Sequence, residues 1–430
     1  QSLSFSPTLS QKKVLNEIAS DLRGEVSMSR MVQGDVGCGK TAVAFGALYL
    51  AFVSGYQAAM MAPTEILASQ HYENAMKALK PLGVHCRLLT GSTKSKERSI
   101  ILQELIDHKC DVVFGTHALI SKDVYYSRLG LVVTDEQHRF GVNQRSNLQA
   151  KGNNQDTLPH VLVMSATPIP RSLALVLYGD LDISVIKELP AGRIPVKTRL
   201  VPENKREDMY RFIRDEISLG RQAYIVCPLV DEDNDSDDLY SVKTHYEHLR
   251  QYELKGLRLC MTWGTQEAEE KKRILTSFAS GEYDILVSTT VIEVGVNNPN
   301  ATIMVIENAE RYGLSQLHQL RGRVGRGQAE SWCFLFADPS EKLHSFCSTN
   351  DGFVIAQKDL DLRGPGDLVG TRQSGMPNAG SVYSDIHLLD EVTQCVHQLH
   401  RDPELYSSLN QIENAALAYF SDEKHMIALN

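Results

Sequence analysis

The chain has 430 residues, of which 42% are hydrophobic and 23% are charged, so it has the composition of an ordinary globular protein of about three domains. Its formal net charge of −9 argues against attraction of nucleic acid by overall charge, although a local basic stripe would still suffice for phosphate contacts. The sequence contains no run of about 20 apolar residues, so we expect no membrane span and no membrane partner.

The start of the chain has neither the basic nor the apolar region of a signal peptide, and it lacks an initiating methionine. The eight cysteines are scattered and never form a C-x-x-C pair, which is typical of reduced thiols in a cytosolic protein. We therefore expect a cytoplasmic chain that was taken from a longer one.

The first part of the chain alternates helix-like segments with short apolar runs rich in Val, Leu and Met. Such runs are typical of strands buried on both faces, and their alternation with helices predicts a parallel α/β sheet. The predicted strands are Ser29–Gln33, Ala58–Ala62, His85–Thr90, Asp111–Phe114, Leu131–Thr134 and Val161–Ser165.

The segment Leu189–Pro195 is punctuated by Pro and Gly, and it reads as a linker after which the α/β rhythm restarts. The expected domains are 1–189, 190–345 and 346–430, the last mostly helical toward its end. The strands predicted for the second domain are Thr198–Val201, Ala223–Cys227, Arg258–Thr262, Ile285–Ser288, Ile303–Ile306 and Ser331–Phe336.

The segment Gly34–Thr41 reads GDVGCGKT and fits the P-loop pattern G-x-x-x-x-G-K-[ST] between a predicted strand and a predicted helix. The backbone around Gly37 and Gly39 would surround the phosphates of ATP at a helix N-terminus. Lys40 would place its ammonium against the β- and γ-phosphates, and the Thr41 hydroxyl would coordinate Mg²⁺.

Two carboxylates, Asp135 and Glu136, follow the apolar run Leu129–Thr134. This places them at the C-terminal end of a strand, where ligands of parallel sheets gather. Asp135 is expected to hold Mg²⁺, and Glu136 is the candidate base that orients and deprotonates water.

A second signature, Gln319–Arg326, carries Arg323 and Arg326 three residues apart, which would lie on one face if the segment is helical there. Gly322 and Gly325 would be poor in an ordinary helix, so they indicate a close approach of the backbone to a ligand. The two arginines are therefore candidate fingers that reach the γ-phosphate from the second domain.

With these three signatures the chain resembles helicase superfamily 2 and, within it, the RecG family of bacterial ATP-dependent DNA helicases, from about Phe5 to Gly375. The resemblance implies two tandem RecA-like domains with ATP and Mg²⁺ bound between them. The family's motifs match Phe5–Gln11, Gly34–Thr41, Ala62–Glu65, Gly115–Ala118, Asp135–Val142, Ser165–Arg171, Ser288–Val296 and Gln316–Gly327.

Several roles follow only from this resemblance. It implies adenine recognition by Gln11, catalytic roles for His138 and Gln319, and contacts of Thr64 and Thr116 with the nucleic-acid backbone. As partners it implies double-stranded and branched DNA, such as stalled replication forks and recombination junctions, and single-strand DNA-binding protein. It also implies a monomer at the bacterial nucleoid.

The segment Asp359–Gly375, DLDLRGPGDLVGTRQSG, resembles the translocation motif of this family. The resemblance implies that Arg363 and Gln373 transmit the closing of the nucleotide cleft to duplex DNA. Four departures weaken the match: Lys342 replaces the usual Arg, which removes a bidentate fork, Asn297 replaces an Asp, Trp263–Thr265 replaces His-Gly-Arg, and Gln357 replaces a Glu. The family's N-terminal wedge domain has no counterpart here, so we expect the motor portion of a longer helicase.

Two other functions remain open at this point. The motor of a transcription-repair coupling factor shares the translocation motif and would be distinguished by binding to a polymerase. A nucleotide-dependent binding module that remodels nothing would show no DNA-stimulated ATP hydrolysis.

Overall fold

The computed structural model describes residues 7–24, 26–135, 158–165, 181–188, 193–228, 242–264, 266–289 and 298–363, with six more residues between 391 and 415. The chain divides into two compact units. One combines Gln1–Pro168 with Asp182–Asp359, and the other combines Ile169–Leu181 with Leu360–Asn430. The first unit contains both sheets and all of the contacts described below.

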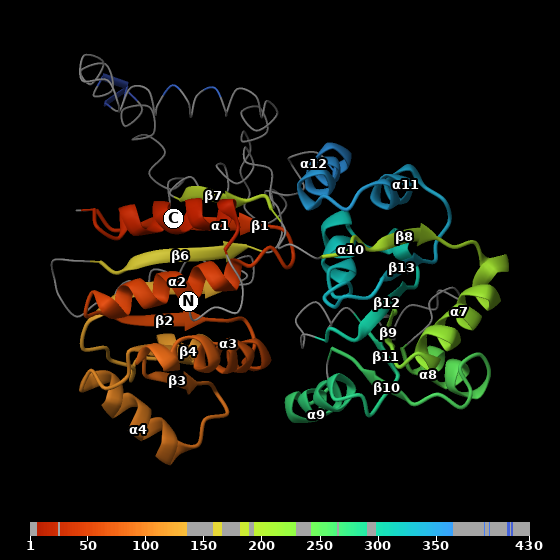
Figure 1. Ribbon diagram of the computed structural model, residues 1–430, viewed down its shortest axis with the longest axis horizontal. Helices are drawn as coiled ribbons and strands as arrows, with labels where there is room; N and C mark the ends of the chain where they lie inside the picture. Colours follow the sequence, from red (N-terminus) through yellow and green to blue (C-terminus); the bar gives the residue numbers. More distant parts are fainter. Residues whose placement is uncertain are drawn as a thin grey trace. The chain divides into compact units, whose positions relative to one another are not determined.

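The first sheet has seven parallel strands in the order β3-β4-β2-β5-β6-β1-β7, and helices pack against it (Figure 1). Its strands are β1 (Ser29–Gly34), β2 (Gln57–Met61), β3 (Cys86–Leu89), β4 (Val112–Gly115), β5 (Leu129–Asp135), β6 (His160–Ser165) and β7 (Asp182–Ile186). Its helices are α1 (Leu9–Asp21), α2 (Lys40–Val53), α3 (Glu65–Ala78) and α4 (Ser95–Ile106), with short 3₁₀ turns η1 (Lys80–Leu82) and η2 (His117–Ile120).

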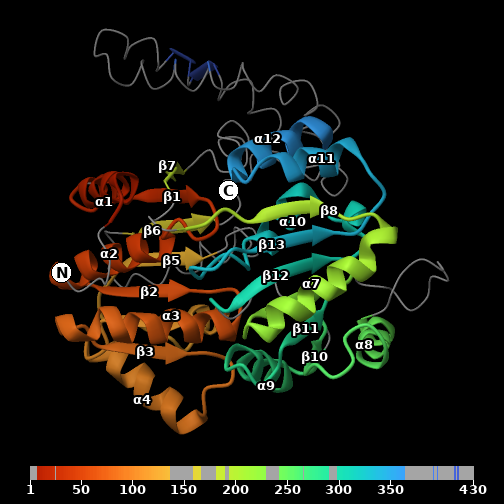
Figure 2. The same cartoon turned by 45° about the vertical axis from the view of Figure 1, so that its right-hand side comes forward.

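The second sheet has six parallel strands in the order β10-β11-β9-β12-β13-β8 (Figure 2). Its strands are β8 (Lys197–Leu200), β9 (Gln222–Val226), β10 (Leu259–Thr262), β11 (Ile285–Ser288), β12 (Ala301–Ile306) and β13 (Trp332–Leu335). The helices are α7 (Arg206–Ser218), α8 (Val242–Gln251), α9 (Ala268–Ala279), α10 (Leu314–Arg321), α11 (Glu341–Ser348) and α12 (Gly352–Arg363), with 3₁₀ turns η4 (Glu203–Lys205) and η6 (Ala309–Arg311).

All twelve predicted strands are confirmed to within two residues at each end, and so is the parallel α/β class. The sequence analysis missed β7, a short edge strand that is only partly buried and therefore lacks the continuous apolar character of its neighbours. The expected domain boundaries stay a prediction. Among the described helices, none has the length and apolar character needed to cross a membrane.

The register of the first sheet fixes where its functional side chains emerge. Gln33 of β1 lies opposite Ser165 of β6, and Met164 of β6 lies opposite Asp135 of β5. The three strands therefore end at one edge of the sheet, with only β6 between the P-loop and Asp135. Since neighbouring strands lie about 5 Å apart, the P-loop strand and the Asp135 strand are separated by about 10 Å.

Candidate nucleotide-binding site

The P-loop joins β1 to α2 and is folded around its own lysine. Gly37 and Gly39 have φ angles of +78° and +88°, a region that favours glycine because it has no Cβ. The Lys40 ammonium donates hydrogen bonds to the carbonyls of Gly34 (2.7 Å) and Asp35 (2.9 Å). The lysine therefore occupies the inside of the loop, in the position from which it can exchange these carbonyls for phosphate oxygens.

Gln11 braces this loop from α1. Its side-chain amide donates to the carbonyl of Cys38 at 2.7 Å, and its own oxygen accepts from the backbone N–H of Thr8 at 3.0 Å. The latter bond belongs to a capping box that starts α1, which explains why a glutamine stands at this position. Adenine recognition by Gln11 stays a prediction, since the contacts described here are with protein.

Asp135 ends β5 at the same edge of the sheet. His71 of α3 lies 2.7 Å away, with Nε2 against the Asp135 carboxylate, and the histidine is buried. An N–H at Nε2 that donates to this carboxylate would orient it and leave its other oxygen available. The sequence offered no signal for His71. Glu136 and His138 lie outside the described residues.

The two arginines of the signature lie beyond helix α10, which ends at Arg321 with Gly322 as its C-cap. The condition under which Arg323 and Arg326 would share a helix face is therefore not met: Arg323 lies in the turn after the helix, and Arg326 lies in the irregular segment that follows. Partial burial, and then the charge of Arg323, lowers the pKa of Arg326 to about 9, so the group stays charged at neutral pH. Gln319 lies half-buried on α10.

A histidine of α10 links this region to the P-loop. His318 Nε2 lies 2.5 Å from the carboxylate of Asp35, and its Nδ1 lies 3.1 Å from the guanidinium of Arg321. Burial alone would raise the pKa of Asp35, but the hydrogen bond and charge of His318 bring it below its ordinary value. Arg321 continues the chain of contacts to the carbonyls of Phe346 and Thr349.

Gly322 is needed because the P-loop packs directly on it. A Cβ at this position would lie 2.7 Å from Cγ1 and 2.8 Å from Cβ of Val36. The glycine in the arginine signature therefore reflects a close approach of the backbone, and the neighbour it approaches here is the P-loop.

Substitution of Gly322 with alanine should disturb this approach. We expect a loss of stability of about 1–3 kcal/mol, the usual effect of overpacking, together with a lower rate of ATP hydrolysis. Thermal unfolding and steady-state turnover would measure both. Val36→Gly in the same chain removes the colliding atoms and should restore part of the stability. An alanine variant with unchanged stability and turnover would contradict the packing argument.

Arg193 is a functional candidate that the sequence analysis missed. It lies in the linker Leu189–Pro195 between the two sheets, and its guanidinium donates to the carbonyl of Val36. A Cβ on Gly37 would fall on the same guanidinium. A lone arginine in a segment rich in Pro and Gly carries no signal by itself, so only the fold reveals its place over the P-loop.

Helix α12 contains the start of the expected translocation segment. Asp359 accepts hydrogen bonds from the backbone N–H of Leu314 (3.4 Å) and the hydroxyl of Ser315 (3.1 Å), at the N-terminus of α10. Lys342 donates to the carbonyls of Glu310 (2.7 Å) and Tyr312 (2.9 Å), so lysine provides two hydrogen bonds here.

The remaining expected translocation residues are not described in full. The side chain of Arg363, the last residue of α12, and the whole of Gln373 lie outside the described part of the chain.

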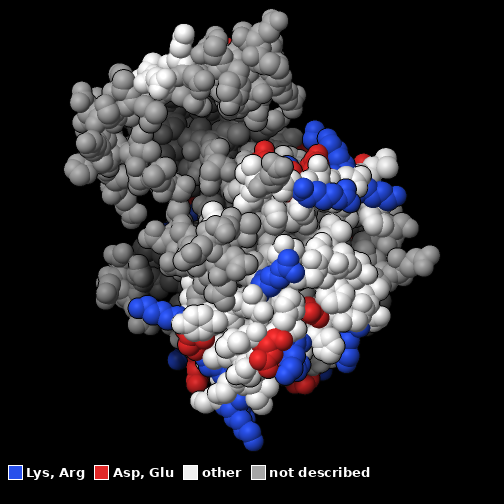
Figure 3. Space-filling model, turned by 90° about the vertical axis from the view of Figure 1, so that its left-hand side faces the viewer, with Lys and Arg blue, Asp and Glu red and all other residues white. Residues whose placement is uncertain are grey.

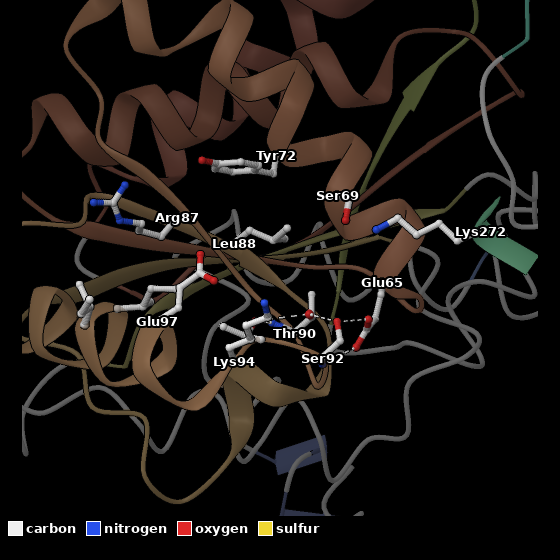
Figure 4. Close-up of a pocket in the computed structure, with 13 residues that line it drawn as sticks. Glu65, Ser69, Tyr72, Arg87, Leu88, Thr90, Ser92, Lys94, Glu97 and Lys272 are labelled. Carbon is white, nitrogen blue, oxygen red and sulfur yellow. Dashed lines mark hydrogen bonds between the residues drawn. The ribbon is translucent and has the colours of Figure 1, made fainter. Parts of the chain in front are cut away.

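The expected nucleic-acid contacts lie at other strand ends. The Thr64 hydroxyl accepts from the backbone N–H of Leu67 and so caps α3, while Thr116 is buried. A cavity of about 550 Å³ adjoins the start of α3. Figure 4 shows its hydroxyl, acidic and basic groups, with the Lys272 ammonium pointing toward Ser69.

On the face that Figure 3 shows, the Lys and Arg side chains of the described residues are interspersed with Asp and Glu, as the negative net charge predicts. Any basic path for DNA is therefore local rather than spread over this face.

Three family models match the chain in succession. Residues 1–176 match the DEAD/DEAH box helicase model, and residues 204–328 match the helicase conserved C-terminal domain. Residues 349–411 match "ATP-dependent DNA helicase RecG, domain 3, C-terminal".

Curated relatives give the same assignment. The chain is 49% identical to the ATP-dependent DNA helicase RecG of Bacillus subtilis over 382 residues, which cover 88% of this chain and 55% of the relative. It is 47% identical to that of Thermotoga maritima over 406 residues, which cover 93% of this chain and 51% of the relative. The chain thus spans about half the length of these relatives.

Solved structures agree in fold. A structure of RecG bound to a three-way DNA junction is similar with a TM-score of 0.75 and 45% identity, over 90% of this chain and 51% of that one. A structure of Mss116p bound to single-stranded RNA and AMP-PNP is similar with a TM-score of 0.60 and 19% identity, over 81% of this chain and 73% of that one, a likeness of fold alone. The two parallel sheets are RecA-like domains, and the chain is similar to the RecG helicases over about nine-tenths of its own length.

Proposed function

We propose that the chain is an ATP-driven motor that translocates on double-stranded DNA and remodels branched DNA, such as stalled replication forks and recombination junctions. One observation carries the proposal: the P-loop of the first sheet and the arginine-bearing segment of the second meet directly. His318 contacts Asp35 at 2.5 Å, and Gly322 packs on Val36. A nucleotide in the P-loop would therefore be sensed by helix α10 and by the segment after it that carries Arg323 and Arg326.

The residues fit a magnesium–triphosphate complex. We propose that the Thr41 hydroxyl and the Asp135 carboxylate hold Mg²⁺, whose charge would neutralise phosphate oxygens during hydrolysis. The described residues contain no cluster of three His, Cys, Asp or Glu side chains, which agrees with an ion held largely by phosphates and water. Glu136 would orient the attacking water, with His138 and Gln319 beside it.

Each side chain then has a defined task in the hydrolysis cycle. The P-loop amides and Lys40 would bind the phosphates, while Arg323 and Arg326 would stabilise the charge that develops on the transferred group. Because those arginines lie in the domain of the second sheet, hydrolysis would require both domains to be in place. Opening and closing of the two domains would then drive the translocation segment, including Arg363 and Gln373, along DNA.

DNA would be held by Thr64, Thr116 and the polar cavity at the start of α3. The buried position of Thr116 requires a rearrangement of the segment after β4 before its hydroxyl can reach a phosphate. The structure of a RecG bound to a three-way junction supports branched DNA as the substrate. From the family resemblance we also propose a monomer in the bacterial cytoplasm, at the nucleoid, with single-strand DNA-binding protein as a partner.

The deciding experiment measures ATP hydrolysis without DNA, with duplex DNA and with a three-way junction, over a range of salt concentrations. We expect stimulation by DNA, strongest with the junction, that weakens as salt rises because phosphate contacts release counterions. Lys40→Ala should reduce turnover to background in all three conditions, since it removes the cation inside the P-loop. Turnover that ignores DNA, or that survives in the Lys40 variant, would refute the proposal.

A further inference from the structure

Arg193 occupies the mouth of the P-loop although it belongs to the segment between the sheets. Its Nη1 donates to the carbonyl of Val36, and its guanidinium lies so close to Gly37 that it would have to move to admit a Cβ there. Val36 and Gly37 stand at the middle of the phosphate-binding turn. The guanidinium is therefore placed against the loop that would receive the phosphates.

The negative charge that acts on this guanidinium comes from Asp35, which also lies against His318. Among the described residues, Arg193 forms no ion pair with a carboxylate, and the nearby Asp35 is already engaged by His318. Burial lowers the pKa of Arg193, and the charge of Arg193 contributes to the lowered pKa of Arg326. A polyanionic ligand would stabilise guanidinium groups that lie this close together.

The backbone next to Arg193 is packed against the arginine signature. A Cβ on Gly325, which has a φ of +71°, would lie 2.8 Å from Cγ2 of Val196 and 3.7 Å from the carbonyl oxygen of Ile194. Gly325 lies directly before Arg326 in the sequence. Arg193 is thus anchored beside the second sheet's arginines while its side chain reaches the first sheet's P-loop.

We propose that Arg193 is a further phosphate-binding residue of this site, which donates to the carbonyl of Val36 when the loop is empty and to the terminal phosphate of bound ATP. The inference rests on the nucleotide-binding function proposed above. A guanidinium suits this exchange because its planar fork can hold a carbonyl or two phosphate oxygens without changing charge. No covalent step is involved.

The test compares binding of ADP and of a non-hydrolysable ATP analogue, both with Mg²⁺, by fluorescence titration of the same chain. For Arg193→Ala we expect binding of the analogue to weaken by about tenfold or more, as for loss of a charge-assisted hydrogen bond, and binding of ADP to change by less than about twofold. Arg193→Lys should show a smaller selective loss because it keeps the charge but not the fork. If the alanine variant does not fold, the lysine variant carries the comparison.

Arg199→Ala is the matched control. Arg199 is exposed on β8, six residues further along, and its guanidinium lies over the ring of Trp332. Arg199→Ala should leave the affinities for ADP and for the ATP analogue unchanged. Equal weakening of both nucleotides in Arg193→Ala would make the residue a structural brace of Val36 and overturn the proposal, as would unchanged or tighter binding of the analogue. A wild-type chain that binds neither nucleotide would instead refute the proposed function.

Discussion

Replacement of Arg326 with alanine should lower the rate of ATP hydrolysis by about 10³-fold or more, the range found when an arginine finger is removed. The reason is electrostatic. Arg326 lies half-buried next to Arg323, and both its burial and the neighbouring positive charge disfavour its charged form. The negative charge that spreads over the transferred phosphate would stabilise the charged guanidinium, so the contact between Arg326 and the phosphate should be strongest in the transition state.

Binding should therefore change much less than turnover. Single-turnover hydrolysis and nucleotide titration on the same preparation separate the two quantities. Arg311→Ala serves as the control, because Arg311 is an exposed arginine of the same domain just before α10. A tenfold or greater loss of nucleotide affinity with unchanged single-turnover rate would assign Arg326 to ground-state binding and contradict the finger role.

The sheets were predictable because parallel strands buried on both faces produce continuous apolar runs. Runs such as Ile285–Ser288 stand out against the amphipathic helices around them, and their order fixes a parallel topology. The strand β7 lies at an edge and alternates in burial, so its sequence differs little from that of a loop. The sequence signal is therefore strongest where burial is most complete.

The P-loop and Asp135 were predictable for a different reason. Each function depends on residues that are adjacent in sequence, so the pattern itself contains the geometry. The contacts of His318 with Asp35, and of Arg193 with Val36, join residues more than 150 positions apart. Nothing in local spacing encodes them, because they depend on how separate elements pack.

Arg323 and Arg326 do not share a helix face because the helix ends just before them. A spacing of three favours one helix face, but Gly322 caps α10 after Arg321. The glycine that the sequence analysis identified as unusual was the better signal, since its missing Cβ admits Val36. A conflict between helix periodicity and helix propensity is thus resolved here by tertiary packing.

Replacement of Asp359 with alanine should uncouple ATP hydrolysis from DNA movement. Asp359 is buried, and its carboxylate holds the N-terminus of α10 through Leu314 and Ser315. A carboxylate at the N-terminus of α10 also interacts favourably with the positive end of the helix dipole. At the N-terminus of α12, the backbone N–H of Gly352 donates to Asp35 of the P-loop at 3.2 Å. Helix α12 therefore contacts both the nucleotide loop and the helix that carries His318.

The proposed site residues are all retained in Asp359→Ala, so ATP turnover should stay within a few-fold of wild type. Displacement of a third strand from a DNA triplex, measured per ATP hydrolysed, should fall by about tenfold or more, because the start of the translocation segment loses its hold on α10. Asp359→Asn keeps a hydrogen-bond acceptor but loses the charge, so its displacement per ATP should lie between those of the wild type and Asp359→Ala. The stability lost with the alanine should be about 1 kcal/mol, as for other helix caps.

Asp338→Ala provides the control, since it removes an exposed carboxylate of the same domain outside the translocation segment. It should leave displacement per ATP unchanged. If Asp359→Ala loses hydrolysis and displacement in equal proportion, α12 supports the nucleotide site instead of transmitting its state. If displacement per ATP stays normal, the route from the P-loop to the translocation segment must bypass the contact between α10 and α12, and Arg321, which joins His318 to Phe346 and Thr349, becomes the next residue to test.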